Sequence, residues 1–297
     1  MKFENIRVMN FEGALRGMRN PKNSWHLADS KFGIGCGDCV IEATDDVASN
    51  WLEFLNKDLN DEDKRDEIVE WLLRNGTIGK GASYSCFEYA FIGPNDMKLA
   101  QQLIRGGSEH RKFLRQIQVS VDITAPLYWW KEFDTYKVGT TANSTSTMHK
   151  ITSKPITIDC FELDDYKDYC EFIPDFLGEE GLSADDCESM IVRFIDFLEG
   201  LRLKYLETKD YRFWKELIRW LPESWLQTRT VTMNYENLLS MYHQRRFHKL
   251  DEWSGIEEDG VMTPTFIKFL EALPYANHFL AFLEIYNCDE VPLVDFS

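Results

Sequence analysis

The sequence predicts an α+β fold in which one mixed or antiparallel sheet is packed by helices. Three observations predict it. Segments with helical periodicity outnumber those with strand periodicity, the clearest alternating segment is short, and 44% of the residues are hydrophobic. A chain of 297 residues with this composition can bury a sizeable core, and we expect one domain over residues 1–297.

The expected helices have start or stop signals in the sequence. Residues 61–74 form an amphipathic pattern that ends near Gly76, and Asn95 is expected to cap a helix that Gly106 and Gly107 end. Ser183 with Asp186 opens a long helical pattern that runs to about residue 203. Further helices are expected at 127–133 after Pro126, at 210–220, after Asn234, and after Thr263–Pro264.

The expected strands lie between these helices. Residues 117–124 alternate apolar and polar side chains, which is typical of a half-buried strand, and residues 225–233 also have strand character. Residues 135–147 are rich in Thr, Ser, Gly and Asn, and we expect a polar loop there.

The charge distribution excludes some partners. The formal net charge is −17, which disfavours long nucleic acids and anionic membrane surfaces. Residues 159–188 hold twelve acidic residues and one lysine, and we expect this segment to be an ordered, acidic surface insertion. Residues 251–259 hold five more acids, so the rest of the chain is nearly neutral and a small anionic ligand remains compatible with it.

The sequence shows no apolar run long enough for a membrane span and no apolar signal core, so we expect a soluble, cytoplasmic protein. The seven cysteines are odd in number and irregularly spaced, which favours free thiols. Cys36 and Cys39 form a C-x-x-C pair with His26 nearby. A loop with two incidental cysteines explains this better than a metal site, and we predict no metal.

Three segments concentrate chemically useful side chains. His243–Lys249 holds three fixed cations and two histidines late on the helix that follows Asn234; it is either a ligand-binding patch or a basic last turn that complements the helix dipole. Arg105–Arg115 is a second basic patch, for which a solvated helix face is the simpler interpretation. The hydroxyl-rich loop at 135–149 is the third, and such loops bind phosphate in some proteins.

The order of these segments resembles the flavin-dependent thymidylate synthases. Residues 103–107 are similar to the family's Gly-ended helix, residues 117–124 to its strand, and Ala125–Tyr128 to its Ala-Pro-aromatic entry. Thr232–Asn234 resembles the family's Thr-Val-Asn, and 251–253 its later acid-Trp stretch. The similarity covers residues 95–148 and 221–253, about a third of the chain.

The resemblance implies a one-carbon transfer from methylenetetrahydrofolate to C5 of dUMP, with FAD reduced by NADPH as hydride source, in a homotetramer. By position, Arg245 is the nucleotide arginine, and Arg245 with Ser146 is the expected catalytic pair. The substrate-binding set is Arg245, Arg246, Ser146, Lys137 and Asn143. The cofactor-binding set is Thr135, Tyr136, Lys137, His110, Arg115 and His248.

The sequence departs from the family at its signature. The family's Arg-His-Arg falls on Thr135, Tyr136 and Lys137, and its loop glutamate and arginine fall on Ser144 and Met148. Three hypotheses therefore stay open: an active flavoenzyme in which Arg111, Lys112, Arg115 or Arg246 supplies the missing charge, a variant enzyme that modifies C5 of a pyrimidine nucleotide, and a non-catalytic nucleotide-binding or structural relative without flavin.

Overall fold

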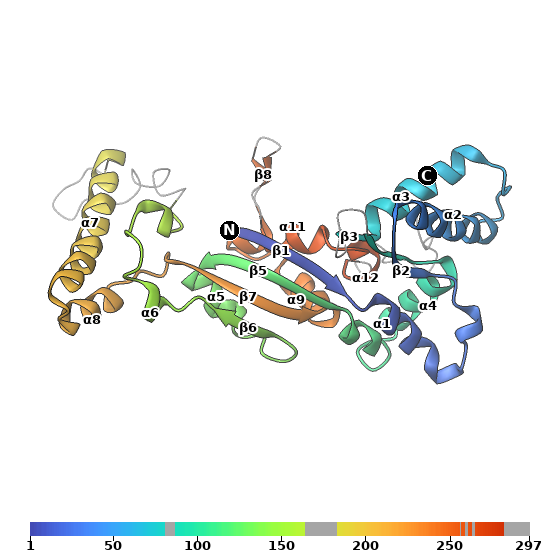
Figure 1. Ribbon diagram of the computed structural model, residues 1–297, viewed down its shortest axis with the longest axis horizontal. Coiled ribbons are helices and arrows are strands. Elements are labelled where there is room, and N and C mark those ends of the chain that lie inside the picture. The colour runs from blue at the N-terminus through green and yellow to red at the C-terminus, as the bar shows by residue number, and fades with distance from the viewer. Residues whose placement is uncertain (81–86, 164–182, 256, 259–260, 263–264, 282–297) are drawn as a thin grey trace. The chain divides into compact units, whose positions relative to one another are not determined.

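The computed structural model describes residues 1–80, 87–163, 183–255, 257–258, 261–262 and 265–281. The chain divides into two compact units. Figure 1 shows its helices and strands, coloured from the N-terminus to the C-terminus. Unit 1 comprises Met1–Lys2, Asp122–Tyr136 and Ala142–Thr230. Unit 2 comprises Phe3–Val121, Lys137–Thr141 and Val231–Ser297.

A four-stranded sheet has the order β1-β5-β7-β6. Its strands are β1 (Lys2–Met9), β5 (Gln118–Pro126), β6 (Thr141–Ser144) and β7 (Leu226–Asn234). In β5 every second side chain is buried, as the alternation in the sequence predicts. Thr124 is hydrogen-bonded to Thr228 and Asp122 to Thr230, so β5 and β7 run antiparallel in that part of the sheet.

Three helices of unit 1 begin at side-chain caps. Ser183 and Asp186 form a capping box at the start of a 25-residue helix, and Asp210 caps the helix after it. The helices are α5 (Leu127–Phe133), α6 (Thr147–Lys150), η4 (Ile158–Cys160), α7 (Ala184–Thr208) and α8 (Tyr211–Arg219). One core cluster lies under α7 and α8 and comprises Ile151, Ile156, Phe161, Leu198 and Leu217.

Unit 2 contains a second sheet that the sequence analysis does not anticipate. Strand β4 lies between β2 and β3 and is antiparallel to both. This part of the unit comprises α1 (Phe11–Arg19), η1 (Asn20–Lys22), η2 (Trp25–Leu27), β2 (Lys31–Gly35), α2 (Gly37–Phe54), α3 (Glu62–Asn75), β3 (Thr77–Lys80) and β4 (Phe87–Phe91). Helix α2 buries one apolar face, and its Trp51 indole donates to the Ile92 carbonyl at 3.1 Å.

The rest of unit 2 carries the predicted Asn-capped helix. Its elements are α4 (Pro94–Arg105), η3 (Lys112–Gln116), α9 (Tyr235–Arg245), α10 (Asp251–Ser254), β8 (Glu257–Glu258), β9 (Val261–Met262), α11 (Phe266–Glu271) and α12 (Ala276–Phe279). An aromatic core joins Phe11, Tyr235, Tyr275 and Phe279, whose ring centroids lie 5.7–6.4 Å apart where they contact.

The fold class is confirmed, because antiparallel sheets are packed by helices, although the structure has more than the one sheet that we expected. Gly93, not Asn95, is the N-cap of α4, because Pro94 takes the first helical position. The expected loop at 135–147 includes strand β6, which pairs with β7. Most of the expected acidic insertion, residues 164–182, and the expected Thr263–Pro264 helix start lie outside the described residues; Thr265 caps α11.

Two expectations about the cysteines are wrong. Cys187 is disulfide-bonded, whereas Cys36, Cys39 and Cys160 are free thiols. Cys36 and Cys39 do not lie in a loop: Cys36 is the N-cap of α2 and Cys39 lies in its first turn. Within the described residues, no group of three His, Cys, Asp or Glu side chains is arranged to hold a metal ion. No described helix has the length and apolar content needed to cross a membrane.

Candidate functional site

The start of α9 is fixed to the loop that precedes β6. Asn234 and Asn237 form a reciprocal capping box, in which the Asn237 backbone N–H donates to Asn234 Oδ1 at 3.0 Å. Asn237 Nδ2 also donates to the Val138 carbonyl at 2.7 Å. Gly139 has a φ of 76°, and a Cβ there would lie 2.8 Å from the Asn234 and Asn237 amides. This contact holds Lys137, two residues before Gly139, near the start of α9.

An ion pair lies at the first turn of α9. Arg111 Nε is 2.9 and 3.1 Å from the two carboxylate oxygens of Glu236, and both side chains are mostly buried. The charge of Arg111 is therefore already balanced within the protein. Lys112 is exposed and lies 3.5 Å from the Glu109 carboxylate. Of the four residues that we considered as replacements for the family's arginines, Arg111 is the least suited, because its guanidinium already binds a carboxylate.

The end of α9 places Arg245 over a buried aromatic ring. Arg245 is the last residue of the helix, and its guanidinium carbon lies 4.8 Å from the ring centroid of Trp253, which is fully buried in α10. Arg246 is the C-cap, and its guanidinium lies 4.4 Å from the ring centroid of Phe247, an exposed side chain. Trp253 thus restrains Arg245, whereas Arg246 stacks on a ring in solvent.

His248 does not lie on α9, contrary to the expectation that the His243–Lys249 segment is helical throughout. The helix ends at Arg245, and His248 Nδ1 accepts a hydrogen bond from the Leu250 backbone N–H at 3.1 Å. Its ring centroid is 6.1 Å from that of Trp253. Trp253, rather than helical spacing, brings Arg245 and His248 to one place.

His243 is the site residue that the sequence analysis missed. It is half-buried near the end of α9, and burial is the main cause that lowers the pKa of its imidazole, followed by the charges of Arg246 and Arg111. A neutral imidazole among cations can accept a hydrogen bond as well as donate one. The signal was present in the sequence, because His243 is in the same basic segment as Arg245.

Two other predicted cofactor residues are exposed in unit 2. The His110 backbone N–H donates to the Gly107 carbonyl at 2.9 Å, so His110 closes the turn after α4. Arg115 is in η3, close before β5. Both side chains face solvent and are accessible to a ligand.

The remaining predicted residues are in unit 1. Thr135 Oγ1 donates to the Glu132 carbonyl at 2.7 Å, and Tyr136 is half-buried directly after it. Asn143 is exposed in β6. Ser146 Oγ accepts a hydrogen bond from the His149 backbone N–H at 3.2 Å and so caps α6. All four residues therefore belong to unit 1. The Ser146 hydroxyl already has a structural role there, because it caps α6.

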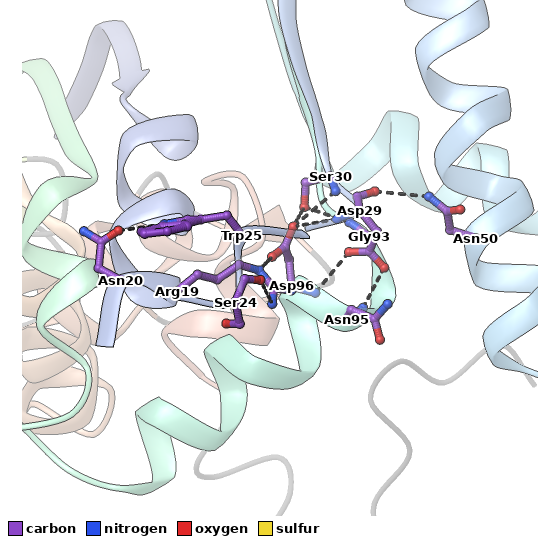
Figure 2. A network of polar contacts seen from close by, with 10 residues as sticks. All are labelled: Arg19, Asn20, Ser24, Trp25, Asp29, Ser30, Asn50, Gly93, Asn95 and Asp96. Carbon is purple, nitrogen blue, oxygen red and sulfur yellow. Dashed lines mark hydrogen bonds and ion pairs between the residues drawn. The ribbon is translucent and has the colours of Figure 1, made fainter. Parts of the chain in front are cut away.

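A buried ion pair in unit 2 was also not predicted. Arg19 Nε donates to Asp96 Oδ1 at 2.6 Å, and Asp96 Oδ2 accepts from the Ser30 hydroxyl at 2.6 Å and from the Asp29 and Ser30 backbone N–H groups (Figure 2). Asp29 in turn accepts from the first N–H groups of α4, and burial raises the pKa of its carboxyl.

This network adjoins a cavity of about 420 Å³, lined by Glu12, Leu15, Arg16, Arg19, Trp25, Ala28, Ser30, Phe32 and Asp96. The charges of Arg19 and Asp96 neutralise each other. The network therefore connects three parts of unit 2: α1, α4 and the segment before β2. Because its charges are balanced, it is not a binding site for an anion. None of the predicted site residues lines this cavity or the second described cavity, of about 210 Å³.

The described fold and site define an α+β protein whose Asn-capped helix ends in a restrained arginine. No protein-family model matches the sequence. No curated protein matches it either.

Solved structures do show a likeness. The chain is similar to the flavin-dependent thymidylate synthase ThyX from Helicobacter pylori with FAD and dUMP, at 12% identity and a TM-score of 0.47, over 94% of this chain and 97% of that chain. It is similar to the UMP/dUMP methylase PolB from Streptomyces cacaoi bound with 5-Br dUMP, at 15% identity and a TM-score of 0.36, over 75% and 81% of the two chains. The first of these proteins is a flavin-dependent thymidylate synthase, the family that the sequence resembles.

Proposed function

We propose that the protein binds a pyrimidine deoxynucleotide and modifies C5 of its base by one-carbon transfer, in the manner that the sequence resemblance implies. One observation carries the proposal: Arg245, at the position of the family's nucleotide arginine, ends an Asn-capped helix and is restrained over the buried ring of Trp253. A restrained guanidinium loses little rotamer freedom when it binds a ligand, so its hydrogen bonds contribute more to affinity.

Each assigned residue has a role that its chemistry supports. The Arg245 guanidinium donates to a uracil carbonyl and stabilises the negative charge that develops on the base when C5 is activated. Lys137, which is held near the start of α9, and Arg246 attract the nucleotide phosphate. Asn143 and Ser146 are assigned to the substrate by the resemblance alone.

The flavin assignment has less support in the structure. FAD is the cofactor that the resemblance implies, NADPH and methylenetetrahydrofolate are the implied co-substrates, and the ThyX structures hold FAD and dUMP. The residues assigned to FAD are exposed or half-buried in two separate units, and neither described cavity includes them.

The nucleotide assignment is tested with dUMP and isothermal calorimetry. Arg245→Ala should weaken dUMP binding at least tenfold, a loss of about 1.4 kcal/mol, because the charged donor to the base is removed. Arg219→Ala is the matched control, since Arg219 also ends an Asx-capped helix but is exposed and paired with Glu216. Unchanged dUMP affinity in a folded Arg245→Ala protein would reject the assignment.

The flavin is tested separately by absorbance. Purified protein that retains FAD, or takes it up when FAD is added, should absorb in the two flavin bands of the near-ultraviolet and blue. If the protein stays colourless but binds dUMP, the flavin-free nucleotide-binding relative is the correct alternative, which the loss of the Arg-His-Arg signature favours. Sedimentation of the same samples tests the homotetramer that the resemblance implies.

A further inference from the structure

Two thiols meet at the start of α2, in a part of unit 2 to which the proposed function assigns no role. Cys36 is the N-cap of this 18-residue helix, and Cys39 is in its first turn. Their sulfur atoms lie 3.5 Å apart, and both side chains are exposed. A disulfide needs sulfurs about 2 Å apart, and residues three apart in a helical turn have Cα atoms about 5–6 Å apart, within the range that a disulfide spans. Rotation of the side chains is therefore sufficient to close the bond.

The surrounding backbone is shaped around Cys39. A Cβ on Gly35 would lie 2.5 Å from Cys39 Cβ and 2.9 Å from its sulfur, so only glycine leaves room for Cys39 at this point. Gly35 ends β2 and pairs with Phe87 of β4, while α2 is anchored by its buried apolar face. The two thiols are thus held between a strand end and a helix start, both of which are fixed by packing.

The two thiols are electrostatically different. Backbone N–H groups of the first helical turn, chiefly that of Cys39, and the Cys39 thiol donate to the Cys36 sulfur and lower the pKa of Cys36. The hydrogen bond with Cys36 raises the pKa of Cys39. The charge of Asp38 opposes the lowering of the Cys36 pKa, whereas the charge of Glu42 adds to the rise in the Cys39 pKa. Lys31, the cation at the start of β2, is paired with Asp46 at 2.8 Å. Cys36 is therefore the better nucleophile and Cys39 the better resolving thiol.

Exposed apolar side chains flank the pair in the sequence. Ile34 and Ile41 are 70% and 61% exposed, two residues to either side of the C-x-x-C segment. A cavity of about 210 Å³ lies beside Ile34 and includes Phe32, Tyr89 and Ala90 among its lining. Glu12 and Glu88 line this cavity, and Asp38 and Glu42 lie near the thiols. These carboxylates repel glutathione, which carries net negative charge. A cavity that offers both apolar and acidic side chains, beside exposed isoleucines, instead suits a polypeptide segment.

We propose that Cys36 and Cys39 form a thiol–disulfide exchange site whose substrate is a disulfide in a polypeptide. The Cys36 thiolate attacks one sulfur of the substrate, the substrate S–S bond breaks, and the released thiolate takes up a proton. Cys39 then loses its proton and attacks the Cys36 sulfur, which forms the Cys36–Cys39 disulfide and releases the second substrate thiol. Two protein thiols are oxidised and one substrate disulfide is reduced, so no other oxidant is needed.

The test uses the full chain with insulin as the polypeptide disulfide. Cys39→Ser should accumulate a mixed disulfide on the tryptic peptide 32–57, because the resolving thiol is absent; Cys36→Ser should form at least about tenfold less. Cys160→Ser, a free thiol in unit 1, is the control and should behave as the parent protein. Equal trapping by both variants, or no trapping by either, would overturn the proposal.

Two further measurements test the choice of substrate and the role of Gly35. Glutathione disulfide should oxidise the pair more slowly than insulin does at equal disulfide concentration, and faster oxidation would reject the polypeptide substrate. Gly35→Ala should slow closure of the Cys36–Cys39 disulfide, whereas Gly37→Ala should not, because a Cβ at Gly37 meets no atom within 4 Å. Binding of dUMP should be unchanged in the cysteine variants, so this proposal and the proposed function fail independently.

Discussion

Helices α8 and α9 have similar sequences at their ends but different surroundings. Each begins at an Asx cap followed by tyrosine and ends in arginine, Arg219 in α8 and Arg245 in α9. Arg219 is 56% exposed and paired with Glu216 one turn back, whereas Arg245 lies over the buried ring of Trp253. A cation at a helix end is ordinary, because the helix dipole favours it. Only the neighbourhood of the second arginine makes it a candidate for ligand binding.

The largest expected difference between the two units is in how their stability changes as the pH falls. Burial lowers the pKa of His278 in unit 2 to about 4, against an ordinary value of 6.5. The unfolded chain therefore binds this proton more tightly, so the contribution of the neutral imidazole to stability is present above pH 6.5 and is lost as the pH falls toward 4. The loss should reach about 3 kcal/mol, and His243 contributes in the same direction.

Unit 1 should lose stability in a lower pH range. The pKa of Glu199 is lowered from 4.5, chiefly by its hydrogen bond with Arg202, so its contribution is lost only as the pH falls below that value. Amide hydrogen exchange, corrected for its intrinsic pH dependence, should therefore rise in α12 before it rises in α7. His278→Gln should flatten the pH dependence in unit 2 whatever its effect on absolute stability. An unchanged slope would show that another group is responsible.

The second-largest expected effect is a difference in stability between the ion pair at α9, Arg111 with Glu236, and the ion pair in α8, Arg219 with Glu216. Glu236→Ala leaves the mostly buried Arg111 without its carboxylate and should lower the free energy of unfolding by about 2 kcal/mol. Glu216→Ala removes the exposed partner of Arg219 and should cost less than about 0.5 kcal/mol. Urea denaturation of both variants measures the difference. Equal losses would mean that solvent screens the Arg111 pair as fully as the Arg219 pair.

Features of the fold that depend on neighbouring residues could be predicted from the sequence, whereas contacts between distant residues could not. The alternation of β5, the capping box of Ser183 with Asp186 and the Asn234 cap depend on neighbours within a few residues, so their patterns are visible in the sequence. The pairing of Arg19 with Asp96 joins residues 77 positions apart, and no local pattern signals it.

The candidate site shows the same division. The family resemblance predicts a nucleotide-binding role for Arg245, but the restraint of Arg245 by Trp253 depends on how the chain returns after the helix ends. The C-x-x-C segment was interpreted as a loop with two incidental cysteines, and a glycine lies on either side of Cys36. In the fold, Gly35 instead makes room for Cys39, and Gly37 begins the helix. A glycine that is needed for close packing cannot be distinguished in the sequence from one that is needed for a turn.

The smallest expected effect concerns the loop fixed to the start of α9. Gly139 and Gly107 both have positive φ, 76° and 90°, so alanine at either position should cost about 1 kcal/mol of backbone strain. At Gly139 the added Cβ would also lie 2.8 Å from the Asn234 and Asn237 amides, whereas at Gly107 it meets no atom within 4 Å. Gly139→Ala should therefore cost about 1 kcal/mol more than Gly107→Ala in thermal or urea unfolding. Because the same clash weakens the bond from Asn237 to the Val138 carbonyl, Gly139→Ala should also lower dUMP affinity, and Gly107→Ala should not. If both variants bind dUMP equally well, the loop that carries Lys137 does not position the nucleotide, and α9 acts through its arginine end alone.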